Sequence, residues 1–337
     1  MVKVGLIGCG FMGTVHATCY RYLENVKVVG VSDLRKEYAK KAADITKSEI
    51  FSDPMELIQC KEVEVIDICL PTYLHKKFIL ACCDAKKNVF CEKPLTLNEQ
   101  DAEEIVMGIK ESKVKFMIGM VLRFWPEYME FKKIVDSGKF GKLKVLQCTR
   151  LSTPPLYGWD NWYLDPIRSG GAALDLHIHD VDFIYYLFGK PESVYSTGRH
   201  NSKNGLEHIC SIYKYKDRIV NAEAGWDLSK SFGFMQEIRG VFEDGTVLIY
   251  NSKNQPLTVF QEENSELVKI NKKEMDSLNS GGNISDILGY YNEIKYWVDC
   301  LQDNRKPERV TIEDAKTSLE IVLAEIKSAK NEQEIVL

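Results

Sequence analysis

The apolar positions of roughly the first 120 residues form short runs that alternate with amphipathic stretches of helical period. The strand-like runs cover residues 2–7, 26–31, 63–70, 88–91 and 115–121. Helices are expected at residues 14–23, 35–45 and 74–85, from Asp53 onward, and over a segment to Ser112 that Thr96 and Glu99 open as a capping box. Apolar strands that alternate with amphipathic helices predict an α/β fold, a parallel, doubly wound Rossmann-type sheet.

Beyond residue 123 the pattern changes to longer runs in which apolar and polar residues alternate. These runs cover residues 142–151, 193–199, 208–215, 219–226, 234–242, 246–250 and 256–261, and they are typical of an antiparallel sheet with one covered face. Helical periodicity marks residues 126–137, 171–187, 286–302 and 312–330. We therefore predict a dinucleotide-binding domain over residues 1–123 and an α+β domain over residues 124–337 with a large, mostly antiparallel open sheet.

Composition excludes several classes of function. The 337 residues are 45% apolar and 28% charged with a net charge of −5, so there is no surplus of Lys and Arg to neutralise nucleic-acid phosphates. No secretory signal is visible, and no apolar run approaches the roughly 18 to 20 residues that cross a membrane. The ten cysteines form no CxxC pair, which favours free thiols in a reducing cytoplasm. We expect a cytoplasmic protein that binds small molecules.

The first chemical motif is the glycine-rich segment that follows the first predicted strand. Gly8, Gly10 and Gly13 stand in the GxGxxG spacing between a strand and a helix. In a βαβ unit the first glycine permits a tight turn, the second lets the backbone approach a pyrophosphate, and the third allows close helix–strand packing. The motif therefore predicts a dinucleotide site, although an ordinary strand–helix turn remains the alternative.

The acid at the end of the second predicted strand bears on which dinucleotide binds. Asp33 stands 20 residues after Gly13, where a carboxylate accepts hydrogen bonds from the adenosine ribose and repels a 2′-phosphate. Arg35 softens that repulsion, so we predict NAD and regard NADP as the less favoured cofactor. Cofactor contacts are expected from Gly8, Gly10, Phe11, Met12, Gly13, Asp33, Leu34 and Arg35.

Two further motifs supply candidates for acid–base chemistry. Lys93, between Glu92 and Pro94 at the carboxyl end of a strand, can reach a substrate oxygen in the cleft, or it can be an ordinary surface lysine. Asp175 and His179 are four residues apart, so on a helix they share one face, and the acid can orient the ring as a general base. The alternatives are polar residues on a helix surface, or a metal centre on His177 and His179; we predict no metal.

Aromatic and charged residues accumulate between the two predicted domains and shortly after. Arg123, Trp125 and Trp162 are the candidates for substrate contact, because aromatic and Arg side chains in loops line carbohydrate pockets. The same residues can equally belong to the core or to an interface.

Taken together, the glycine fingerprint, Glu92-Lys93-Pro94 and the Asp175…His179 helix resemble, in this order, the glucose–fructose oxidoreductase and inositol dehydrogenase family (Gfo/Idh/MocA). The resemblance runs over essentially the whole chain and includes Pro71-Thr72 followed by His75, and the closing helix with Asp314-Ala315. The Glu-Lys-Pro signature together with Asp-x-x-x-His is far more specific than the glycine motif, which many folds share.

The resemblance implies an NAD(P)-dependent oxidoreductase that transfers a hydride between nicotinamide and a hydroxyl carbon of a sugar, a cyclitol such as inositol, or a related polyol. It implies that Lys93, Asp175 and His179 form the catalytic set and also touch substrate, and that the bond preceding Pro94 is cis. It also implies that Pro71, Thr72, His75 and Glu92 line the cofactor cleft, and that the open sheet packs in a homodimer or homotetramer. A redox-neutral sugar-processing enzyme with recycled NAD, or a non-catalytic nucleotide sensor, stay open as alternatives.

Overall fold

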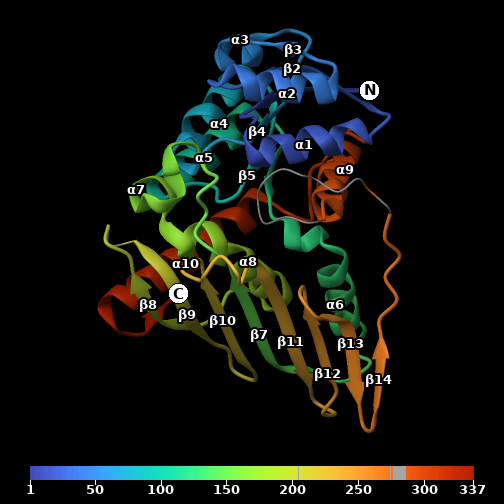
Figure 1. Cartoon of the computed structure of the whole chain (residues 1–337), viewed down its shortest axis with the longest axis vertical. Helices are drawn as coiled ribbons and strands as arrows, with labels where there is room; N and C mark the ends of the chain where they lie inside the picture. The colour runs from blue at the N-terminus through green and yellow to red at the C-terminus, as the bar shows by residue number, and fades with distance from the viewer. Residues whose placement is uncertain (204, 274, 276–285) are drawn as a thin grey trace. The chain divides into compact units, whose positions relative to one another are not determined.

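The computed structural model describes residues 1–203, 205–273, 275 and 286–337 of the chain, and these residues form two compact units (Figure 1). The first unit comprises residues 1–121 and 157–162 together with the described part of 275–316. The second comprises residues 122–156, the described part of 163–274, and residues 317–337.

Six strands form the sheet of the first unit in the order β3-β2-β1-β4-β5-β6, and all neighbours are parallel. Their bounds are β1 (Val2–Ile7), β2 (Val26–Ser32), β3 (Glu49–Ile50), β4 (Val65–Ile68), β5 (Asn88–Glu92) and β6 (Phe116–Gly119). The chain order reverses between β1 and β4, which is the topological switch point where doubly wound sheets bind their ligands, outside the carboxyl ends of the strands. The predicted Rossmann sheet is confirmed.

Helices cover this sheet, and its central strands are buried along nearly their full length, which explains their continuous apolar runs. The helices are α1 (Phe11–Arg21), α2 (Lys36–Thr46), α3 (Pro54–Gln59), α4 (His75–Asp84), α5 (Glu99–Ser112) and α9 (Leu288–Gln302), with a 3₁₀ turn, η1, at Thr72–Leu74. The helix α3 begins as predicted, because the Asp53 carboxylate accepts a hydrogen bond from the Met55 amide at 2.8 Å.

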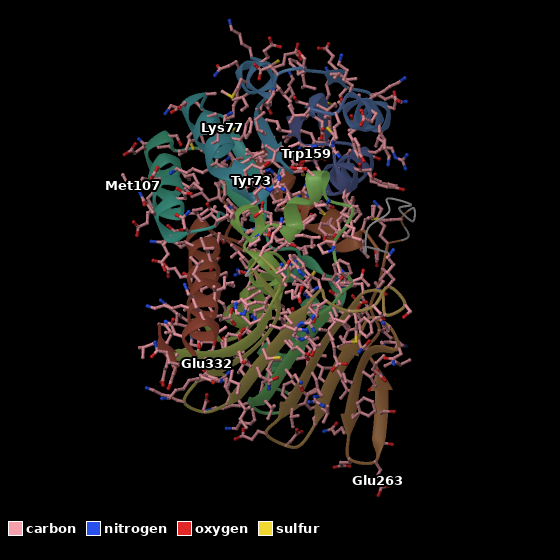
Figure 2. All side chains as sticks on the ribbon, turned by 60° about the vertical axis from the view of Figure 1, so that its left-hand side comes forward. Tyr73, Lys77, Met107, Trp159, Glu263 and Glu332 are labelled. Carbon is pink, nitrogen blue, oxygen red and sulfur yellow. The ribbon has the colours of Figure 1, made fainter. Side chains whose placement is uncertain are left out.

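Nine strands form the sheet of the second unit in the order β14-β13-β12-β11-β7-β10-β9-β8-β15. Their bounds are β7 (Leu143–Leu151), β8 (Ser193–His200), β9 (Leu206–Lys214), β10 (Ile219–Gly225), β11 (Met235–Phe242), β12 (Val247–Asn251), β13 (Gln255–Gln261), β14 (Asn264–Leu267) and β15 (Ile335–Val336). Every neighbouring pair is antiparallel except β7 with β10, so the predicted mostly antiparallel sheet is confirmed. Figure 2 labels Glu263 at the tip of the β13–β14 hairpin.

One face of the second sheet is buried and the other is exposed, as the alternating pattern requires. In β9, Ile209 and Tyr213 are buried while Cys210 and Ile212 between them are exposed. The helical segments of this unit include α6 (Pro126–Ser137), α7 (Pro166–Ser169), a π-helical turn, η4 (Ala173–His177), α8 (Ile178–Phe188) and the later part of α10 (Ile312–Asn331). Two 3₁₀ segments, η2 (Val121–Phe124) and η3 (Trp159–Leu164), lie where the chain passes between the units.

The units divide the chain differently from the predicted boundary at residue 123. The helix α9, expected in the second domain, packs against α1 and β1 of the first unit, and residues 157–162 also belong there. Sequence periodicity shows that a helix is amphipathic, but it does not show which apolar surface the helix covers. The assignment of α9 to the first unit therefore could not be predicted from the sequence.

Several local predictions need correction. The helix α5 starts at Glu99 with Asn98 as its cap, because the Asn98 side chain accepts from the Asp101 amide at 2.9 Å; the predicted capping box on Thr96 is wrong. The strands β3, β14 and β15 were not expected, since each has only two to four residues. Across the described residues, no helix combines the length and apolar character needed to cross a membrane.

Candidate active site

Two glycines of the turn between β1 and α1 lie where the chain's own backbone leaves no room for a side chain. Gly8 has a φ of +88°, and a Cβ on it would lie 2.4 Å from the carbonyl oxygen of Cys69. A Cβ on Gly13 would lie 1.9 Å from the carbonyl oxygen of Gly8, so this position tolerates only glycine. At Gly10 an added Cβ would meet Arg35 at 3.3 Å. The turn therefore fits the pyrophosphate cradle that the spacing predicted, at the N-terminus of α1.

Asp33 braces this turn from the end of β2. One carboxylate oxygen accepts a hydrogen bond from the Cys9 amide at 2.8 Å, and the other accepts from the Arg35 amide at 2.8 Å. The Arg35 guanidinium lies over the ring of Tyr38, 3.7 Å from its centroid, and Leu34 is 81% exposed. The carboxylate thus stands at the edge of the glycine turn, where the adenosine ribose would lie.

Lys93 follows β5 and is half-buried within an otherwise buried segment, from Cys91 to Thr96. The Lys93–Pro94 peptide bond is cis, as the resemblance implied. The fully buried ring of His75 lies between two carbonyl oxygens, 2.8 Å from that of Pro94 and 2.9 Å from that of Leu70. His75 therefore ties the Lys93–Pro94 turn to the segment after β4, and burial lowers the pKa of its imidazole.

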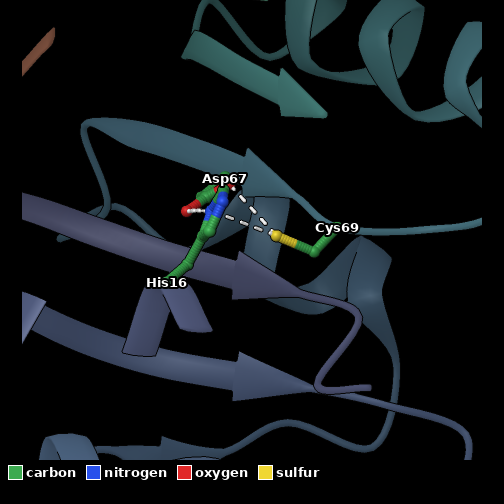
Figure 3. Close-up of side chains that lie close together, drawn as sticks. All are labelled: His16, Asp67 and Cys69. Atoms are coloured by element: carbon green, nitrogen blue, oxygen red, sulfur yellow. Dashed lines mark hydrogen bonds and ion pairs between the residues drawn. The ribbon is translucent and has the colours of Figure 1, made fainter. Parts of the chain in front are cut away.

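Behind this turn lies a buried polar network that the sequence analysis did not identify. His16 on α1 has its Nδ1 atom 2.8 Å from an Asp67 carboxylate oxygen and its Nε2 atom 3.0 Å from a Glu92 oxygen. The Cys69 sulfur is 3.2 Å from the same Nδ1 atom (Figure 3). Asp67 lies in the apolar strand β4, and a carboxylate in a buried parallel strand needs a hydrogen-bond partner. An acid inside an apolar run was therefore the feature of the sequence that could have indicated this network.

Asp175 and His179 belong to the second unit, on the π-helical turn and the helix α8 that follows it. From Gly171 to Ile184, every residue is buried except these two, which are half-buried. Both side chains therefore lie on the side of the helical segment that is open, as the four-residue spacing predicted. The sequence predicted an uninterrupted helix here, but the structure widens it into a π turn, a feature frequent at functional sites.

His177 does not share the open side of the helical segment with Asp175 and His179. It is fully buried, and its Nε2 atom lies 3.1 Å from a carboxylate oxygen of Glu325 on α10 and 3.2 Å from the hydroxyl of Tyr213 on β9. The Tyr213 hydroxyl in turn donates to Glu325 at 2.5 Å. His177 therefore joins the helical segment to α10 and β9 in the interior of the second unit.

The predicted substrate residues differ in their surroundings. Arg123 is 2% exposed, and its guanidinium donates two hydrogen bonds to Asp182, at 2.8 and 2.7 Å. This geometry gives Arg123 a structural role, and its contact with substrate stays a prediction. Trp125 precedes α6 in the second unit, and Trp162 is 7% exposed in the first. On the first unit, Tyr73 and Trp159 are more exposed, at 36% and 39% (Figure 2).

Two groups in the described part of the chain bring three metal-type ligands within 4.8 Å of one another. They are His16 with Asp67 and Cys69, and His208 with Cys210 and Glu223. Neither group contains His177 or His179, so the alternative of a metal centre on those two residues gains no support.

Comparison with known proteins matches two models of one family. Residues 2–120 match its first domain, described as an oxidoreductase family with an NAD-binding Rossmann fold, and residues 128–247 match the GFO/IDH/MocA C-terminal domain. A myo-inositol 2-dehydrogenase of Thermotoga maritima is 34% identical over 201 residues, which are 58% of each protein. The match thus spans little more than half the length of that curated relative.

Other relatives extend the likeness to nearly the whole chain. A scyllo-inositol 2-dehydrogenase (NAD(+)) of Bacillus subtilis is 26% identical over 98% of this chain and 94% of its own length. A levoglucosan dehydrogenase, solved with NADH and levoglucosan, superposes with a TM-score of 0.83 at 19% identity, covering 99% of both chains, which shows a common fold. With both of its domain models matched in order, the chain belongs to the Gfo/Idh/MocA family of oxidoreductases.

Proposed function

We propose that this protein is an NAD-dependent dehydrogenase that oxidises a hydroxyl carbon of a cyclitol, a sugar or a related polyol. The observation that carries the proposal is the carboxyl edge of the first sheet. There the glycine turn after β1 and the half-buried Lys93 after β5 lie at the same edge, because all six strands are parallel. The names of the inositol dehydrogenase relatives support the substrate class.

The residues of this chain divide the work of binding and proton transfer. The cofactor-binding set is Gly8, Gly10, Phe11, Met12, Gly13, Asp33, Leu34, Arg35, Pro71, Thr72, His75, Glu92 and Lys93. A nicotinamide dinucleotide, when bound, supplies the hydride acceptor. We assign the general base to His179, which takes the proton of the substrate hydroxyl, and we assign to Lys93 a hydrogen bond to the same oxygen. Asp175 orients this pair, and Arg123, Trp125 and Trp162 complete the proposed substrate contacts.

Asp33 supports NAD rather than NADP as the cofactor. Its carboxylate is fixed by the Cys9 and Arg35 amides, so it cannot swing away from an incoming 2′-phosphate without breaking two hydrogen bonds. A fixed negative charge at this place favours ribose hydroxyls over a phosphate group.

The outer face of the nine-stranded sheet supports a homo-oligomer. The strand register places Tyr195, Ile212, Ile219 and Phe260 on one face, and these side chains are 40% to 62% exposed. Exposed apolar residues that share a face mark association surfaces. A cytoplasmic location is supported by the ten cysteines, all of which are free thiols.

The test follows the absorbance of reduced nicotinamide while purified protein meets NAD and a panel of cyclitols, aldoses and sugar acids. We expect turnover with one group, and we expect Lys93→Ala and His179→Ala each to lower kcat by about three orders of magnitude or more. In His179→Ala, which lies outside the proposed cofactor contacts, the Kd for NAD should change less than about threefold. Turnover that survives in both variants would remove the proposal.

The remaining alternatives give different results in the same assay. If the absorbance of reduced nicotinamide does not change with any compound, but a sugar is still converted with less than one equivalent of NAD, the redox-neutral enzyme is favoured. Tight cofactor binding without any conversion points to the nucleotide sensor.

A further inference from the structure

The buried ring of His16 connects two carboxylates on neighbouring strands of the first sheet. Asp67, on β4, accepts hydrogen bonds at one oxygen from His16 and from the Tyr20 hydroxyl, both at 2.8 Å. Glu92, the last residue of β5, lies 3.0 Å from the other ring nitrogen of His16. Because a carboxylate only accepts, the ring satisfies both partners when both of its nitrogens carry a proton.

The connection continues from Glu92 to Lys93. The second carboxylate oxygen of Glu92 accepts a hydrogen bond from the backbone amide of Lys93 at 3.2 Å. The residue paired with Glu92 on β6 is Gly119, and a Cβ there would lie 3.2 Å from the carboxylate. The absence of a side chain at Gly119 therefore leaves room for the Glu92 carboxylate in the position where it can receive both bonds.

We propose that His16 is a positioning residue for Lys93: its ring holds the Glu92 carboxylate against Asp67 and so fixes the backbone from which the Lys93 side chain projects. The inference rests on the proposed function, in which Lys93 contacts the reacting oxygen. It also links the glycine turn to the lysine, because His16 stands one turn into α1, the helix that begins at that turn.

The charge around His16 favours the doubly protonated ring. Burial by itself lowers the pKa of the imidazole, but the Asp67 carboxylate outweighs burial and raises that pKa well above its ordinary value. Burial and Asp67 raise the pKa of the Cys69 thiol, which therefore stays neutral. The titratable groups that face or influence this cluster come from three elements besides β5: Cys19 and Tyr20 on α1, Asp67 and Cys69 on and after β4, and Tyr290 and Glu293 on α9.

The test compares His16→Asn with His16→Gln. The amide nitrogen of Asn takes a place near Nδ1 and retains the bond to Asp67, while that of Gln takes a place near Nε2 and retains the bond to Glu92. We expect His16→Asn to lower kcat about 10- to 100-fold with little change in the KM for NAD, because the reactive group is displaced, and we expect His16→Gln to keep most of kcat. Tyr20→Phe, the matched control, removes only a hydroxyl bond to Asp67 and should lower the Tm but not kcat.

A second readout does not depend on turnover. Hydrogen exchange of the Lys93 amide, measured without cofactor, should be faster in His16→Asn than in the wild type and in His16→Gln. Equal exchange rates in the two variants, or equal losses of kcat, overturn the positioning role and leave His16 as a residue that only stabilises the core. A wild type that converts no polyol contradicts the proposed function, while the exchange rates still decide whether His16 positions Lys93.

Discussion

At the scale of single residues, Asp33 has two tasks that a substitution can separate. Its oxygens accept the Cys9 and Arg35 amides, and its charge faces the place proposed for the ribose. Asp33→Asn keeps the size and one acceptor oxygen but removes the charge.

We expect Asp33→Asn to lower the ratio of kcat/KM for NAD to that for NADP about tenfold, since a repulsion against the 2′-phosphate is lost. The measurement is the pair of kcat/KM values with each cofactor. Asp44→Asn removes the same charge from the exposed side of α2 and should leave the ratio unchanged. A variant that loses both cofactors equally would show that only the backbone bonds matter.

A second residue-scale prediction concerns pH. Burial lowers the pKa of His208, but hydrogen bonds to Asp227 and Glu223, at 2.8 and 3.0 Å, outweigh it and raise that pKa. A raised pKa in the folded state means that the imidazolium stabilises the protein below the ordinary pKa of about 6.5, and that this stabilisation disappears as the pH rises through the folded value.

The Tm difference between wild type and His208→Gln should therefore be larger at about pH 6 than at about pH 9. Thermal melts of both proteins at the two pH values measure it. A difference that is the same at both values contradicts the raised pKa.

At the scale of elements, the start of α5 shows that the sequence can offer two candidate helix caps of which the structure uses one. Asn98 caps α5, although the sequence also offered Thr96 with Glu99 in capping-box spacing. The structure uses Asn98, whose side chain accepts a hydrogen bond from the Asp101 amide at 2.9 Å.

Replacing Asn98 with Ala should lower the free energy of unfolding by about 1 kcal/mol, because the Asp101 amide loses its acceptor. Glu99→Ala, which a capping box would make costly, should cost only about 0.3 kcal/mol through the helix dipole. Urea denaturation of the two variants measures both. A larger loss for Glu99→Ala would restore the capping box.

The sequence could predict those parts of the fold and the site that depend on residues close together in the chain. Strands β1, β2, β4, β5 and β6 and the long helices follow from periodicity, because apolar spacing is a property of neighbouring residues. The glycine turn, the Asp175 and His179 face and the position of Lys93 also follow from local motifs. The network of His16, Asp67 and Glu92 does not, because it joins three segments that only the parallel sheet brings together.

At the scale of the whole molecule, the exposed face of the second sheet is the feature with the clearest consequence for assembly. Ile212 lies on that face in β9, between Tyr195 on β8 and Asn221 on β10 in the register, and is 60% exposed.

A charge placed there should dissociate the proposed oligomer. We expect Ile212→Lys to reduce the sedimentation coefficient to that of a monomer, since a buried unpaired ammonium is costly in an interface. Met107→Lys, at an exposed apolar position on α5 of the first unit, is the control and should leave assembly unchanged (Figure 2). A wild type that already sediments as a monomer contradicts the association surface.

The helix α9 has a consequence for how the protein is made. It packs on α1 and β1, and its Trp297 stacks near Phe90 of β5 with 6.3 Å between ring centroids, yet the ribosome makes it only after strands β7 to β14. During synthesis the apolar surface around Phe90 therefore stays uncovered until α9 has emerged. A nascent chain that ends before Leu288 is a natural client for chaperones that hold exposed apolar surface.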